Sequence, residues 1–350
     1  MRLEPIAAPS WQRRLLPPAL ALLTTFALAA LLAQIAGGEP LSIFGLILTG
    51  AFGSKFALLE TLNRATPLIF TGLAIAVAFR AKLWNIGAEA QLYAGAVITV
   101  VLGTGSLPNL PAPLLLPILG AAAVIAGAGL LLVPALLKTR LGVDEVVTTL
   151  LFNFIFLLFV SYLLEGPLKD PMGMGWPKSP RLDPEARLPR VFDGLRLHWG
   201  FALALISALL VWLINTRTTL GYEMRAVGQN AEAARFAGIP VTKVILKTAL
   251  LSGGLAGLAG YSEVAGLKGA LTLDLSPGFG YTGIVVAMLA LLHPIGVVFA
   301  ALFVAAIFVG ADSMSRAAGV PSYLADIMLA SALLLMVLAI LLSKFRLRRD

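Results

Sequence analysis

Long runs of apolar residues without charge recur along most of this chain, and they constrain its fold more than any other feature. A helix needs about 20 apolar residues to cross the hydrocarbon core of a bilayer, which is about 30 Å thick. Backbone groups in lipid must find partners inside the protein, so helices satisfy them best. The sequence therefore predicts an all-α, polytopic membrane protein of about ten spans, near residues 15–36, 63–79, 85–103, 112–136, 145–164, 199–215, 246–263, 277–291, 295–311 and 323–342.

Composition supports this fold class. Hydrophobic residues make up 59% of the 350 residues and charged residues only 13%, unlike a soluble globular chain. A net charge of +8 on a soluble protein would suggest a nucleic-acid partner, but in a membrane protein basic residues set topology. We therefore expect lipid and no nucleic acid, and the absence of cysteine excludes disulfides and thiolate sites.

Basic residues are unevenly distributed between the predicted loops. With the N-terminus inside, sixteen Lys and Arg residues fall in the inner segments, and the short outer segments hold only Lys55, Arg64, Lys268 and Arg316. The other six lie in one long outer loop, residues 165–198. Because basic residues are enriched in short cytoplasmic loops, this asymmetry predicts that both termini are cytoplasmic.

Several segments outside the spans have a predicted role. The first apolar run, residues 15–38, is longer than a signal-peptide core, so we expect a retained span. Hairpins are expected at Gly103-Thr104-Gly105 and at His293-Pro294. The run 43–52 is too short to span and predicts a re-entrant or interfacial helix. The outer loop 166–198 is either a lid or docking surface or a plain solvated connector.

No motif for catalysis or for ATP binding occurs in the sequence. A GxxxxGK[ST] phosphate loop, an HExxH pair and a GxSxG elbow are all absent, and the only histidines are His198 and His293. We predict that the chain is not an enzyme, has no metal site, and binds no cofactor itself.

Start and stop signals in the inner loop 217–245 predict a short helix from Asn230 to Ala237. Asn230 is an N-cap residue, and Gly238 with Pro240 ends the segment. Ala233, Phe236 and Ala237 share one face, which suits docking into another protein. The alternative is an amphipathic helix lying in the headgroup layer.

Polar residues at membrane depth usually line a cavity, and four of them are our candidates for a substrate pathway: Asn85, Glu89, Gln91 and Asn153. Helical spacing places Asn85 and Glu89 on one face, with Gln91 elsewhere. Glu89 as an N-terminal capping carboxylate is the competing interpretation. Glu145, Thr149 and Asn153 form a stripe at i+4 steps, which either lines the pathway or holds the bundle together.

Glycine spacing and span length give two further expectations. Gly253 and Gly257, followed by Gly260, predict close helix packing. Measured between charges, the spans 65–79 and 248–262 are both short, and paired short helices point to a transport pathway.

Five blocks of residues resemble the permease subunits of ABC importers for sugars, branched-chain amino acids and nucleosides, with the nucleoside branch fitting best. They are PLIFTG at 67–72, WNIGAEAQ at 84–91, DEVVTTLLFN at 144–153, RAVGQNAEAARFAGI at 225–239 and SPGFGYTGI at 276–284. Ala90 departs from the family block, which has Gly there.

This resemblance implies a single permease domain over residues 1–350, with a type II-like importer fold in a bacterial-type plasma (inner) membrane. It implies a separate ABC ATPase subunit that binds ATP, a second permease subunit in a heterodimer, and an extracytoplasmic substrate-binding lipoprotein. The segment 225–239 resembles the helix that docks on the ATPase, which assigns coupling to Gly228, Asn230, Ala234, Arg235 and Gly238.

Two rival functions stay open at this point. A permease for a monosaccharide or a branched-chain amino acid would share the architecture. A secondary transporter would couple to an ion gradient through Glu89 or Glu263, which both lie near span ends.

Overall fold

The computed structural model describes residues 2–5, 39–105, 110–192, 194–318 and 345–348, together with scattered positions between 16 and 35 and between 323 and 335. It divides into two compact units. The larger comprises residues 62–303 and holds nearly all of the predicted site residues. The smaller comprises residues 1–61 and 304–350.

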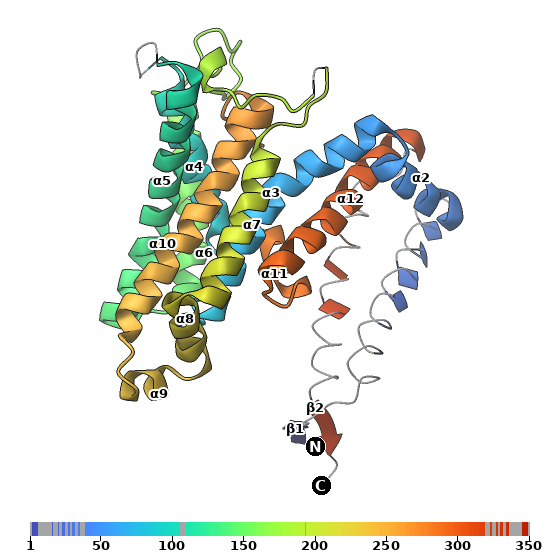
Figure 1. Cartoon of the computed structure of the whole chain (residues 1–350). Helices are drawn as coiled ribbons and strands as arrows, with labels where there is room; N and C mark the ends of the chain where they lie inside the picture. The colour runs from blue at the N-terminus through green and yellow to red at the C-terminus, as the bar shows by residue number, and fades with distance from the viewer. Residues whose placement is uncertain are drawn as a thin grey trace. The chain divides into compact units, whose positions relative to one another are not determined.

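Helices make up most of the described residues, as predicted (Figure 1). Among the described residues, strands are confined to a four-residue antiparallel pair, β1 (Arg2–Pro5) with β2 (Phe345–Arg348). The helices are α2 (Pro40–Phe52), α3 (Lys55–Arg80), α4 (Ala88–Gly103), α5 (Ala112–Leu141), α6 (Glu145–Glu165), α7 (Gly200–Arg217), α8 (Thr219–Gln229), α9 (Ala231–Phe236), α10 (Val241–Tyr261), α11 (Phe279–Leu289) and α12 (Pro294–Ala318), with a 3-10 helix η1 (Pro184–Ala186) and a π-helix η2 (Ser262–Lys268).

Eight of the ten predicted windows coincide with a helix, and six helices are long and apolar enough to cross a membrane. These six are α3, α5, α6, α7, α10 continued by η2, and α12. The windows 15–36 and 323–342 lie largely outside the described residues. A polytopic helical fold is thus supported, and the described residues do not confirm the count of ten.

The predicted pair of short spans is wrong. Helix α3 has 26 residues, and α10 with η2 has 28. The prediction counted residues between charges, but these helices continue through their charged positions. Arg64, for example, lies inside α3 with its guanidinium 5.3 Å from the centre of the Phe279 ring. The short apolar helices are instead α4, with 16 residues, and α11, with 11.

Glycines allow α10 to pack directly on the backbones of α4 and α5, as the GxxxG spacing predicts. A side chain at Gly257 would collide with the Ala123 carbonyl of α5, and one at Gly260 with the Leu92 carbonyl of α4. On the facing helix, Gly127 lies equally close to Gly253. Small residues thus bring the backbones of three helices into direct contact.

Both predicted hairpins occur where the polypeptide leaves one helix and enters the next. Leu291 and Leu292 adopt positive φ angles of 50° and 60°, and α12 begins directly after His293 at Pro294. Helix α4 ends at Gly103 and α5 begins at Ala112. The predicted helix near residues 43–52 is found as α2, with 13 residues.

The loop from Gly166 to Trp199 is hydrogen-bonded to η2 and the residue that follows it. The amide of Leu188 donates to the Ala265 carbonyl of η2 at 2.8 Å, and that of Leu182 donates to Gly269 at 2.9 Å. His198 is fully buried, and its Nδ1 accepts from the Gly200 amide at 3.1 Å. Burial lowers the pKa of His198 to about 4, so this imidazole is neutral at physiological pH.

We predict that Gly257→Ala destabilises the protein, because the added methyl group meets the Ala123 carbonyl of a packed helix. Overpacking of this kind costs about 1–3 kcal/mol. The matched control is Gly129→Ala on α5, where a Cβ meets nothing within 4 Å. Thermal unfolding of the purified protein in detergent should show a lower Tm for the first variant only. Equal Tm values would contradict the direct backbone packing.

Candidate functional site

The connector between α3 and α4, residues 81–87, is a non-helical stretch inside a helical bundle. Helix-like bonds join only its two ends to the neighbouring helices: Leu83 donates to the Ala78 carbonyl of α3 at 3.0 Å, and the Gly87 carbonyl accepts from Gln91 of α4 at 3.2 Å. Lys82 has a positive φ of 53°. Backbone groups freed in this way inside a helical bundle need other partners in the protein.

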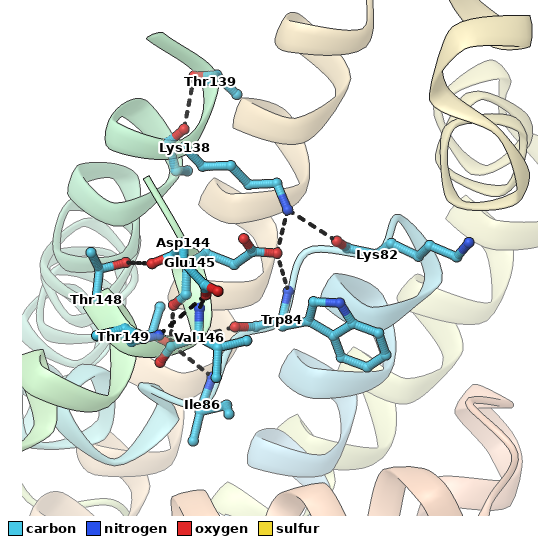
Figure 2. Close-up of polar contacts among 12 residues, drawn as sticks. Lys82, Trp84, Ile86, Lys138, Thr139, Asp144, Glu145, Val146, Thr148 and Thr149 are labelled. Atoms are coloured by element: carbon cyan, nitrogen blue, oxygen red, sulfur yellow. Dashed lines mark hydrogen bonds and ion pairs between the residues drawn. The ribbon is translucent and has the colours of Figure 1, made fainter. Parts of the chain in front are cut away.

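The polar stripe of α6 supplies those partners, and its side chains are buried as predicted. Glu145 accepts from the Trp84 amide at 3.3 Å, and the Thr149 hydroxyl accepts from the Ile86 amide at 3.2 Å (Figure 2). The stripe therefore replaces the bonds that a helix would have made along this connector.

Asn153 completes the same contact one turn further along α6. Its Nδ2 donates to the Ile86 carbonyl at 2.9 Å, and its Oδ1 accepts from the Ala90 amide at 2.9 Å. Nδ2 also donates to the Tyr281 hydroxyl of α11 at 3.1 Å. Both polar atoms of Asn153 are thus occupied within the chain, which favours the bundle-holding alternative for this residue.

The charge of Glu145 is balanced by Lys138 from the last turn of α5. The two side chains form an ion pair, and Lys138 also donates to the Lys82 carbonyl at 3.4 Å (Figure 2). The short turn between α5 and α6 brings Lys138 and Glu145 together. Asp144 ends this turn and caps α6 by accepting from the Val146 amide at 2.7 Å. Lys138 was not among the predicted site residues.

Asn85 and Gln91 form a reciprocal amide pair. Asn85 Nδ2 donates to Gln91 Oε1 at 2.9 Å, and Gln91 Nε2 donates to Asn85 Oδ1 at 2.8 Å. Asn85 also donates to the Ser252 hydroxyl of α10 at 3.1 Å. The predicted shared face of Asn85 and Glu89 is wrong, because α4 begins only at Ala88 and Asn85 folds back from the connector.

Glu89 points instead to the N-terminus of α11. The carboxylate Oε2 accepts from the Gly280 amide at 2.6 Å, and the side chain is only 3% exposed. A carboxylate in this position is stabilised by the unpaired amides and the positive end of the helix dipole. The capping alternative is therefore supported, although the helix that Glu89 caps is α11 and not its own.

Tyr281 is the member of this cluster that reaches the surface, with 37% of its side chain exposed. The sequence placed it within the SPGFGYTGI block without assigning it a role. Ser252, which bonds to Asn85 and to the Ala74 carbonyl at 2.7 Å, was likewise missed. Nothing in the spacing of α10 or α11 indicated which of their residues would face the connector.

The segment after α7 carries the predicted docking helix. Asn230 caps α9 by accepting from the amides of Glu232 at 2.9 Å and Ala233 at 3.0 Å. Gly238 has a φ of 83°, and the next residue, Ile239, donates to the Ala234 carbonyl at 3.0 Å, which ends the helix. The local fold was correctly predicted from its start and stop signals.

Burial separates the coupling candidates into anchors and exposed residues. Ala234 is the buried residue of α9, and Gly228 is buried because α8 lies directly on the Arg80 carbonyl at the end of α3. Arg235 is exposed, and Phe236 is 97% exposed. A large aromatic residue held outward on a capped helix is a surface suited to a protein partner.

The cluster offers no catalytic or metal chemistry within the described residues. No group of three or more His, Cys, Asp and Glu residues there could hold a metal ion. The polar side chains are held by one another and by the backbone, so the arrangement is a hydrogen-bonded frame around the connector.

The sequence of the chain is similar to a family of transport proteins. Residues 57–342 match the family model described as branched-chain amino acid transport system / permease component. The chain is 37% identical to the guanosine ABC transporter permease protein of Bacillus subtilis, over 91% of this chain and 92% of that protein. It is 36% identical to the glucose ABC transporter permease protein of Haloferax volcanii, over 94% and 88%.

A third relative is the nucleoside ABC transporter permease protein NupB of Lactococcus lactis, 30% identical over 91% of this chain and 89% of that protein. No solved structure matches the chain.

We predict that Asn153→Ala lowers the Tm of the purified protein, because it leaves the Ile86 carbonyl and the Ala90 amide unpaired. Each unsatisfied buried group costs about 1–3 kcal/mol. Thr148→Ala on the same helix is the control, since its hydroxyl bonds only to the Asp144 carbonyl of its own helix. An unchanged Tm combined with altered transport would instead identify Asn153 as a pathway residue.

Proposed function

Since the chain belongs to the family described as branched-chain amino acid transport system / permease component, we propose that it is the membrane permease subunit of an ATP-driven importer of nucleosides. The observation that carries the proposal is the near full-length similarity to the guanosine permease of Bacillus subtilis. The nucleoside permease of Lactococcus lactis supports the same substrate class.

ATP hydrolysis belongs to a separate ABC ATPase subunit in this proposal. The chain itself carries no phosphate loop, and α9 presents an exposed Phe236 and Arg235 to a partner. Gly228 and Ala234 would pack α8 and α9 against the bundle. Asn230 and Gly238 would fix the two ends of α9. Movement of the ATPase would thus be passed to α3, on whose end α8 lies.

The proposed complex also contains a second permease subunit and an extracytoplasmic substrate-binding lipoprotein. Within one chain, the polar atoms of Asn85, Gln91 and Asn153 are paired with each other or with the backbone. A pathway that exchanges hydrogen bonds with substrate then needs surface groups, such as Tyr281, facing a second subunit. Asn85, Glu89, Gln91 and Asn153 form the wall behind that surface.

The proposed topology has a type II-like fold, about ten spans and both termini in the cytoplasm of a bacterial-type plasma membrane. The bias of basic residues supports it. The pairing of residues 2–5 with 345–348 also supports it, because two paired strands would have to lie on one side of a membrane. In this topology the loop 166–198 is extracytoplasmic and the loop 217–245 is cytoplasmic.

A glucose importer is the second candidate, and the glucose permease of Haloferax volcanii favours it. Uptake into vesicles that contain the complete complex and ATP separates the two candidates. We predict uptake of guanosine that unlabelled glucose does not reduce and that a proton uncoupler leaves unchanged. Glucose uptake without guanosine competition would overturn the nucleoside assignment, and loss of uptake with the uncoupler would overturn ATP-driven import.

We predict that Phe236→Ala reduces nucleoside-stimulated ATP hydrolysis by the complex about tenfold, as expected for an aromatic interface residue. The side chain is 97% exposed, so its removal should leave the fold intact. Phe154→Ala on α6 is the matched control, because Phe154 is 58% exposed on a predicted span. Equal activity of the two variants, with equal recovery of the ATPase subunit, would contradict docking through α9.

A further inference from the structure

A strongly basic pocket lies where the loop 166–199 meets η2. Its volume is about 260 Å³, and its wall includes four cationic side chains: Arg181, Arg187, Arg190 and Lys268. The rest of its lining is Leu188 and the segment 265–269. No Asp or Glu belongs to the lining in the described part of the chain. All four cationic residues are exposed.

The arginines of this basic pocket are not neutralised by the carboxylates of the described residues. Arg187 donates twice to the Leu182 carbonyl, at 3.2 Å from Nε and 2.9 Å from Nη2, and this holds the guanidinium in place. Asp274 is the carboxylate whose charge interacts with Lys268. An excess of cationic groups in one small pocket favours an anion with several oxygen acceptors, such as a phosphate ester.

An apolar groove adjoins the basic pocket. It has a volume of about 460 Å³ and lies between α5, α7 and α10, which are neighbours in Figure 1. Small residues on two of these helices, Gly120, Ala121 and Ala202, leave the space open. Its larger lining residues are apolar apart from the Tyr261 hydroxyl, which donates to the Leu116 carbonyl at 3.2 Å.

Leu188 belongs to the walls of both the pocket and the groove. Its amide bond to Ala265 fixes it at the end of α10, so the two spaces keep their mutual position. Trp199, also in the groove lining, is 54% exposed and directly precedes α7. Aromatic residues at the ends of membrane-spanning helices commonly lie at the bilayer interface. A basic site followed along the helices by an apolar groove matches an amphiphile with an anionic head.

We propose that the basic pocket and the apolar groove together bind one anionic phospholipid. Its phosphate contacts Arg181, Arg187, Arg190 and Lys268, and one acyl chain lies in the groove between α5, α7 and α10. The three helices are candidate membrane spans, so the groove is open to bilayer lipid. In the proposed topology this site lies at the outer leaflet, and the binding site itself does not depend on the transported substrate.

Native mass spectrometry of the full chain, released from nanodiscs of mixed phosphatidylglycerol and phosphatidylethanolamine, tests the proposal. The wild type should retain phosphatidylglycerol in preference to phosphatidylethanolamine. The double variant Arg190→Gln/Lys268→Gln should lose that preference, by about fivefold for each cation removed. Ala202→Phe, which fills the groove and leaves the four cations in place, should also reduce retained phosphatidylglycerol.

The matched control is Arg140→Gln/Lys243→Gln, which removes one Arg and one Lys that are exposed at the opposite ends of α5 and α10. Leu209→Phe, at an exposed position of α7 outside the groove, controls for the added ring. Both controls should retain phosphatidylglycerol as the wild type does. A melting temperature for each variant shows that a loss of lipid is not a loss of fold.

Several results would overturn the proposal. Equal lipid retention by the wild type and both site variants would exclude the lipid. Displacement of phosphatidylglycerol by inorganic phosphate, which has no acyl chain, would leave a simple anion pocket. Unchanged lipid retention with weaker binding of the extracytoplasmic partner by the Arg190→Gln/Lys268→Gln variant would identify an acidic protein surface as the true occupant.

Discussion

The break between α3 and α4 is the constraint on which the rest of the larger unit depends. Backbone amides at Trp84, Ile86 and Ala90 have no helical partner, and burying them unpaired would be costly. Three side chains of α6 satisfy them at regular i+4 intervals. This fixes the orientation of α6, requires Lys138 to neutralise Glu145, and ties the turn between α5 and α6 to the same connector.

The small-residue packing of α10 supports this arrangement from the other side. Because Gly257 and Gly260 let α10 touch the backbones of α5 and α4, Ser252 comes close enough to bond to Asn85. Glu89 then links α4 to the first turn of α11, and Asn153 reaches Tyr281 on the same helix. Movement of any one of these helices would therefore disturb hydrogen bonds on several others. Such coupling would let helices move together in a protein whose proposed function is transport.

Local signals in the sequence predicted local structure well. The cap at Asn230 and the glycine at Gly238 predicted the ends of α9, and the i+4 spacing from Glu145 to Asn153 predicted a buried face. Predictions failed where tertiary contacts decide. Asn85 was treated as helical, although it lies before α4 and pairs with Gln91. Span lengths were measured between charged residues such as Arg64, although Arg64 lies within α3. The role of Tyr281 depends on where α11 packs, and no spacing rule gives that.

The central claim is that this chain transports nothing alone and serves as the membrane part of an ATP-driven nucleoside importer. Its most direct test is purification of the tagged chain from its native membrane, with mass spectrometry of the partners and an ATPase assay of the complex. The account predicts an ABC ATPase, a second permease and a binding lipoprotein, with hydrolysis stimulated by nucleosides. A chain that purifies alone and transports on an ion gradient would contradict it.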